Sequence, residues 1–121
     1  MRRKKTVKVG EIQNYLNLEL EAGARGLEKE ISAGYCGDLL SDVMANAKKG
    51  GVWLTIQSHQ NIVAVAALRE LAAIVLVNGR APDEDTKAKA EEEGIPILVS
   101  PLSSYALAGK LYGLGIGRIE E

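Results

Sequence analysis

The feature that most constrains this chain is a strand-like run that leads through a short polar loop into an apolar helix. Residues 52–56 are rich in β-branched and aromatic side chains, which favours a buried strand. The polar residues 57–60 follow, and 61–70 is rich in alanine and apolar on nearly every side. Since a helix without a polar face is buried on more than one side, this unit is expected inside a layered domain, with Ala66 enclosed.

The same order of strand, loop and helix recurs towards the C-terminus. Residues 73–77 form a continuous apolar run, as central parallel strands do, and 97–99 form a shorter one. Pro82 is a good first residue for a helix that stops at Gly94, and Ser103 is a good cap for a final helix. The alternation predicts a single α/β domain with a largely parallel sheet covered by helices.

The N-terminal half is less regular. Apolar residues within 9–16 recur at the spacing of one helix face, and 18–22 alternates with period two, which indicates a half-buried strand at an irregular or mixed edge. A weak strand is expected over 28–33, broken by 34–37. Asp38 is expected to cap the helix that follows.

That helix is expected to close over Lys48 to Gly51, where lysines face the negative end of its dipole and glycine takes the left-handed cap.

Composition narrows the class of protein. The 121 residues are expected to form a basic tail over 1–6 and one domain over 7–121. The formal net charge of −1 argues against nucleic acid as a partner. No run approaches the roughly 20 apolar residues of a membrane span. With one cysteine and no apolar run behind the basic start, we expect a cytoplasmic protein.

Four loops follow the expected strands, and they carry most of the polar side chains that could bind a ligand. If the strands are parallel, these loops meet at one edge of the sheet, where α/β domains bind ligands and where helix N-termini favour anions. Arg80 could supply a fixed cation for a phosphate or carboxylate. The candidate ligand-binding residues are Gln57, Ser58, His59, Asn61, Asn78, Gly79, Arg80, Ser103 and Ser104.

Each candidate also has a simpler interpretation. His59, the only histidine, could equally be a solvent-facing loop residue, and Ser58 or Asn61 could serve only as a helix cap. Cys36 and His59 could form a base-activated nucleophile across adjacent loops, although no third orienting group is evident. No metal-ligand spacing and no phosphate-binding loop is present, so we expect neither a metal nor a cofactor, and no catalytic residue.

Three segments resemble the DRTGG domain family, which is similar to the N-terminal domain of HPr kinase/phosphorylase. They are 38–45, 53–59 and 74–79, and the resemblance continues through the helix and strand expected over 83–98. It covers nearly the whole chain and implies an α/β fold, a frequent dimer and a regulatory or ligand-sensing role. The Asp-Arg pair of the family's name motif is absent, because the corresponding loop, 58–62, reads Ser-His-Gln-Asn-Ile.

These observations favour a non-catalytic regulatory module that binds a small anionic metabolite or nucleotide at the strand ends. The alternative is an accessory subunit of a larger enzyme complex that acts through protein–protein contacts. A homodimer is expected, because the alanine-rich surface and the Val and Ile runs are extensive for so small a chain with few aromatic residues.

Overall fold

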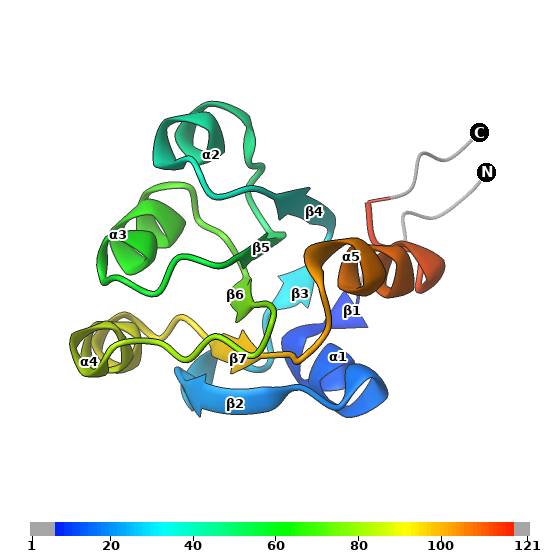
Figure 1. The fold of residues 1–121 in the computed structure, drawn as a ribbon, viewed down its shortest axis with the longest axis horizontal. Helices are drawn as coiled ribbons and strands as arrows, with labels where there is room; N and C mark the ends of the chain where they lie inside the picture. The colour runs from blue at the N-terminus through cyan, green and yellow to red at the C-terminus, as the bar shows by residue number, and fades with distance from the viewer. Residues whose placement is uncertain (1–6, 118–121) are drawn as a thin grey trace.

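The computed structural model describes residues 7–117, and the expected basic tail over 1–6 lies outside them. Its main sheet has five strands in the order β2-β7-β6-β5-β4 (Figure 1). Neighbouring strands from β4 to β7 run parallel, and β2 is antiparallel to β7. The predicted α/β fold with a largely parallel sheet and one mixed edge is therefore confirmed. The strands are β2 (Glu19–Ala22), β4 (Ala33–Cys36), β5 (Gly51–Thr55), β6 (Ala73–Leu76) and β7 (Ile97–Val99).

Helices cover both faces of this sheet, because the central strands are apolar on both sides. Trp53, Ile74 and Ile97 face one helical layer, whereas Leu54, Val75 and Leu98 face the other. Figure 1 shows α2, α3 and α4 on the left of the sheet and α1 and α5 on the right. The helices are α1 (Val9–Leu16), α2 (Leu40–Asn46), α3 (Asn61–Leu68), α4 (Glu84–Glu93) and α5 (Ser104–Gly113).

Helix α3 is present as predicted, and it buries one side rather than its whole circumference. Ile62, Val63 and Ala66 are fully buried against the sheet and its neighbouring helices. Ala64 is exposed, and Leu68 is 71% exposed. The expectation that Ala66 is enclosed is therefore confirmed, while the outer face of α3 is apolar and open to solvent.

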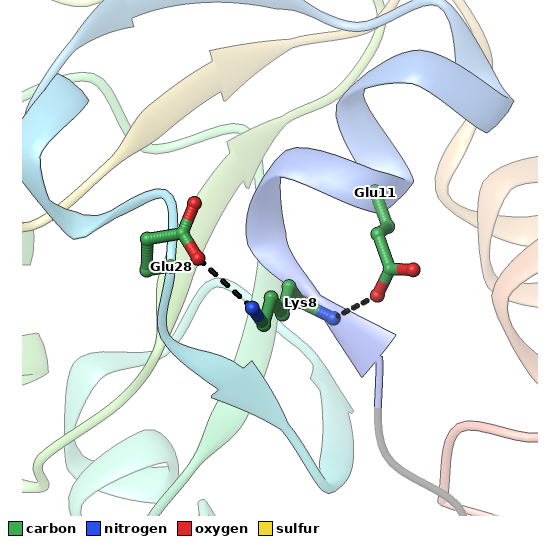
Figure 2. A network of polar contacts seen from close by, with 3 residues as sticks. All are labelled: Lys8, Glu11 and Glu28. Carbon is green, nitrogen blue, oxygen red and sulfur yellow. Dashed lines mark hydrogen bonds and ion pairs between the residues drawn. The ribbon is translucent and has the colours of Figure 1, made fainter.

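A small antiparallel pair, β1 (Val7–Lys8) with β3 (Glu30–Ile31), joins the start of α1 to the rest of the domain. Figure 2 shows Lys8 between two carboxylates. The backbone amide of Lys8, the cap residue of α1, donates to the Glu11 carboxylate at 2.8 Å, as cap amides often do to the third residue of a helix. The Nζ of Lys8 lies 2.9 Å from the Glu28 carboxylate. The hydrogen bond and charge of Glu28 raise the pKa of Lys8.

Three predictions of where an element begins, ends or breaks were wrong. Residues 33–36 form a strand instead of a break, since pairing with β5 supplies the hydrogen bonds that their weak strand propensity does not indicate. Helix α2 ends at Asn46 with Ala47 extended, so Gly50 and Gly51 do not cap it. Helix α4 begins at Glu84 with Asp83 as its cap, so Pro82 precedes the helix. The left-handed end at Gly94 and the Ser103 cap, which accepts from Ala106, are confirmed.

Candidate functional site

The loops that follow β5, β6 and β7 lie together at one edge of the sheet and are tied by backbone hydrogen bonds. Val77 donates to the Thr55 carbonyl at 3.1 Å. Asn78 donates to the Leu102 carbonyl and Gly79 to the Ser100 carbonyl, both at 2.8 Å. The parallel strand order produces this arrangement, because every β-to-α connection leaves from the same end.

The Ser58 carbonyl links the loop after β5 to the start of α4. It accepts from the Asp83 amide at 3.1 Å and from the buried Thr86 hydroxyl at 2.7 Å. Arg80 lies three residues before Asp83, and His59 directly follows Ser58. The two candidate side chains with the strongest anion-binding chemistry therefore come from loops that contact each other.

The first turn of α3 offers fewer free amides than its sequence indicates. The Asn61 amide donates to Nδ1 of His59 at 3.2 Å, Ile62 donates to the His59 carbonyl, and Val63 donates to the Gln60 carbonyl. The cap residue is Gln60, which makes no side-chain capping bond, and the His59 ring accepts from the amide of Asn61, the first residue of the helix. Because Nδ1 accepts, Nε2 carries the hydrogen in the neutral ring and remains a donor on an exposed residue. Because these amides already have acceptors, an anion bound at this loop would contact side chains rather than the amides of the first helical turn.

Arg80 is an exposed cation at this edge. Asn78 and Gly79 before it have φ of 58° and 68°, a left-handed turn that places residues 78–80 at the surface. Within residues 7–117 the Arg80 guanidinium makes no hydrogen bond or ion pair. Its fork of donors is therefore free to bind a phosphate or carboxylate.

Two of the remaining candidate residues, Ser103 and Gln57, already make hydrogen bonds within the domain. Ser103 is exposed, and its hydroxyl oxygen accepts from the Ala106 amide at 3.2 Å. Ser104 is half-buried as the first residue of α5. The Gln57 side chain donates to the Asp38 carbonyl at 2.8 Å, so it turns towards the loop after β4.

Asp38 has a role that the sequence did not indicate. It does not cap α2, whose cap residue, Leu39, makes no side-chain bond. Instead its Oδ1 accepts from the Thr55 hydroxyl at 2.8 Å and from the Ile56 amide at 2.9 Å. Asp38 thus holds together the ends of β4 and β5. The one indication of this contact in the sequence was Thr55, a polar residue at the end of an otherwise apolar strand.

Cys36 does not have the environment of an activated thiol. Partial desolvation, and secondarily the Asp38 charge, raise the pKa of this cysteine, whereas nucleophilic thiols require a lowered one. Within residues 7–117 no hydrogen bond joins Cys36 to His59, and no group of three or more His, Cys, Asp or Glu side chains is placed to hold a metal ion.

A hollow of about 500 Å³ lies at the opposite edge of the sheet, near the ends of α3 and α4. Helix carbonyls point towards this edge, and basic side chains bind them: Arg25 donates to the Glu92 carbonyl at 2.6 Å and Lys29 to the Gly94 carbonyl at 3.1 Å. Burial, and secondarily Arg25, lower the pKa of Lys29. Since helix C-termini carry partial negative charge, this hollow is unfavourable for anions.

No helix within residues 7–117 is long and apolar enough to span a bilayer. No family model matches the sequence, and no curated protein matches it significantly.

Among solved structures, the chain is similar to the CBS and DRTGG domains of the regulatory region of Clostridium perfringens pyrophosphatase, determined with the activator diadenosine tetraphosphate. The TM-score is 0.70 at 12% identity, over 91% of this chain and 47% of that one. The chain thus spans about half of the structure that it matches. At this identity the likeness is one of fold, and it supports the DRTGG-like fold that the sequence predicted.

Proposed function

We propose that this chain is a non-catalytic regulatory module that binds a small anionic metabolite or nucleotide at the loops after β5, β6 and β7. The observation that carries the proposal is that two exposed side chains, His59 and an Arg80 guanidinium with no hydrogen bond or ion pair within residues 7–117, come from neighbouring segments that the Asp83-to-Ser58 backbone hydrogen bond joins. A planar guanidinium binds a phosphate or carboxylate through two parallel hydrogen bonds. The Nε2 hydrogen of His59 adds a donor from the neighbouring loop.

The structural neighbour supports this class of function. That protein's domains are a regulatory region, and its activator is a polyphosphate dinucleotide. A regulatory role and a phosphorylated ligand are therefore reasonable for a chain of the same fold. Because the Asp-Arg pair of the DRTGG motif is replaced by Ser58-His59-Gln60-Asn61, we expect the ligand contacts here to come from His59 and Arg80.

A thermal-shift experiment with the full chain tests the proposal. The probes are diadenosine tetraphosphate, ATP, AMP and inorganic phosphate, since together they vary the base and the number of phosphates. A probe that binds only the native state stabilises it by about 2.7 kcal/mol at a hundred times its Kd. We expect at least one probe to raise the melting temperature.

Three variants then locate the effect. Arg80→Ala and His59→Ala are each expected to weaken binding of that probe, with little change in the melting temperature of the unliganded chain, because both residues are exposed on loops. Lys48→Ala is the matched control, an exposed cation in the connection between α2 and β5 at the opposite edge. If all three variants bind the probe as the wild type does, the ligand site is elsewhere.

An accessory subunit of a larger enzyme is the second candidate. It is favoured by large apolar side chains that remain open to solvent, namely Leu39 at 68%, Leu68 at 71% and Tyr105 at 91% exposure. Such side chains mark protein-binding surfaces when they gather in patches. Co-purification with one enzyme from the native host, together with no response to any probe, would favour this function over ligand sensing.

A further inference from the structure

Tyr105 stands at the start of α5 and takes little part in the packing of the domain. It is 91% exposed, and within residues 7–117 its side chain makes no hydrogen bond or ring contact. An aromatic ring that remains in water contributes little to folding, because the hydrophobic stabilisation comes from burial. The faces of this ring are therefore available to a ligand.

Backbone hydrogen bonds fix the start of α5 against the turn that carries Arg80. The Asn78 amide donates to the Leu102 carbonyl at 2.8 Å, and Arg80 follows Asn78 by two residues. Tyr105 follows Leu102 by three residues, and the hydroxyl of Ser103 caps the helix between them. Arg80 and Tyr105 therefore lie at the same edge of the sheet, where the loops after β5, β6 and β7 meet.

The geometry of a helix directs the Tyr105 side chain towards these loops. Each Cα–Cβ bond of an α-helix tilts towards the N-terminus, so a side chain covers the turn that precedes its own Cα. Tyr105 is the second residue of α5, and the chain before the helix is the loop after β7. Its ring is therefore expected to lean over that loop rather than along the helix.

Gly109 leaves the helix surface beside Tyr105 uncovered. It lies four residues after Tyr105, and a side chain at that position ordinarily leans back over the residue one turn earlier. A Cβ at Gly109 would meet no atom within 4 Å, and its φ is not positive, so neither packing nor backbone conformation in the described part of the chain requires a glycine. A shallow depression of about 660 Å³, lined by Tyr105, Gly109 and their neighbours on α5, gives a flat molecule access to the ring.

We propose that Tyr105 stacks on the base of a nucleotide whose phosphates bind Arg80 and His59. This inference rests on the proposed function and names the ligand of that site as a nucleoside polyphosphate. The Arg80 guanidinium suits the anionic end of such a ligand, because its donors match phosphate oxygens. Tyr105 suits the flat end, because aromatic side chains stack on any base through its π-face. A simple phosphate or carboxylate would leave Tyr105 without a role.

Isothermal titration calorimetry of the full chain with ATP and with inorganic tripolyphosphate separates stacking from phosphate binding, because both probes carry three phosphates and only ATP has a base. Tyr105→Ala is expected to weaken ATP binding at least about fivefold, which is the low end for the loss of one stacked base. The same variant is expected to bind tripolyphosphate as the wild type does. Tyr105→Phe keeps the ring and is expected to keep the affinity for ATP.

Gly109→Leu tests the same contact without altering the tyrosine. Its Cβ meets open space, so the variant is expected to fold, and the leucine would lean back over Tyr105 and cover part of the ring. ATP binding is expected to weaken, and tripolyphosphate binding is expected to be unchanged. Tyr15→Ala is the matched control, since it removes a tyrosine of α1 that is 62% exposed, and it should change neither affinity.

The stacking inference and the proposed function fail in different ways. If ATP and tripolyphosphate bind the wild type and Tyr105→Ala weakens neither, stacking is overturned while the anion site stands. Equal losses for both probes in Tyr105→Ala would overturn stacking too, because the effect would not depend on the base. If neither probe binds the wild type, the anion site itself is overturned and the nucleotide with it.

Discussion

The hydroxyl of Thr55 donates a hydrogen bond of 2.8 Å to the carboxylate of Asp38, and this contact joins the ends of β5 and β4. The same carboxylate oxygen accepts from the Ile56 amide, and the Thr55 oxygen accepts from the Gln57 amide at 3.2 Å. Thr55 is fully buried, whereas Asp38 is exposed. The pair therefore anchors the beginning of the loop that carries Ser58 and His59.

Thr55→Val tests this anchor, because valine keeps the shape of threonine and loses the hydroxyl. Two hydrogen bonds disappear, and we expect the free energy of unfolding to fall by about 1–2 kcal/mol. Urea unfolding measures the change. Ser41→Ala, on the exposed side of α2, is the control and should be near neutral. Equal stability of Thr55→Val and the wild type would contradict the anchoring role.

Gly23 and Gly79 both have positive φ, at 78° and 68°, but only Gly23 is enclosed. A Cβ at Gly23 would overlap the Ile95 carbonyl and Pro96, whereas a Cβ at Gly79 would meet nothing within 4 Å. Gly79→Ala should therefore cost only the left-handed strain of about 1–2 kcal/mol. Gly23→Ala should cost that strain plus about 1–3 kcal/mol of overpacking. Denaturant unfolding of the pair checks the difference, and equal losses would disprove it.

Ala66 and Ala64 lie on opposite sides of α3, one fully buried and the other exposed. Ala66→Asp would bury an unpaired carboxylate, so the free energy of unfolding should fall by about 4 kcal/mol or more. Ala64→Asp, with the same substitution two residues earlier, should stay within about 0.5 kcal/mol of the wild type. Circular dichroism during urea unfolding distinguishes them. Similar losses in both variants would mean that α3 is not oriented as described.

Tyr35 has a pH-dependent contact with Asp42. Its hydroxyl donates to the Asp42 carboxylate, and that hydrogen bond, with smaller contributions from desolvation and charge, raises the pKa of Tyr35 from 10.0 to about 12. The folded pKa is above the unfolded one, so the contact stabilises the fold fully below pH 10 and is lost as pH rises through about 12.

Tyr35→Phe should therefore be less stable than the wild type at neutral pH, with the difference narrowing between pH 10 and pH 12. Unfolding midpoints across that range measure the narrowing. Ultraviolet titration adds a second check, since the component near pH 12 should be missing in the variant. A stability difference that does not change with pH would contradict this assignment.

Most of the sheet was predictable because its central strands are apolar runs whose burial outweighs other preferences. Residues 52–56 and 73–77 are apolar runs of this kind. The end of α4 was predictable for a local reason, because its last turn closes on a residue in the left-handed conformation and Gly94 adopts that conformation readily. Strand β4 was not predictable, because Ala-Gly-Tyr-Cys has weak strand propensity and forms its ladder only with β5.

The candidate site was predictable only as a set of loops. Parallel strands bring 57–61, 78–80 and 100–104 to one edge, and the sequence pattern indicates that much. Individual partners depend on tertiary contacts. His59 accepts from the Asn61 amide, and Gln57 binds the Asp38 carbonyl, although both were expected to face a ligand. The ligand-binding roles of these residues stay predictions.

An NMR titration of the uniformly ¹⁵N-labelled chain with diadenosine tetraphosphate tests the central claim most directly, because it locates the ligand as well as detecting it. Inorganic phosphate and AMP are titrated in parallel, and Arg80→Ala is the variant. We expect the amide shifts to concentrate in 57–61 and 78–80, with Ser103 and Ser104, and to weaken in Arg80→Ala. Shifts confined to the opposite edge around Lys29 and Glu70, or no saturable shift with any of the three probes, would contradict it.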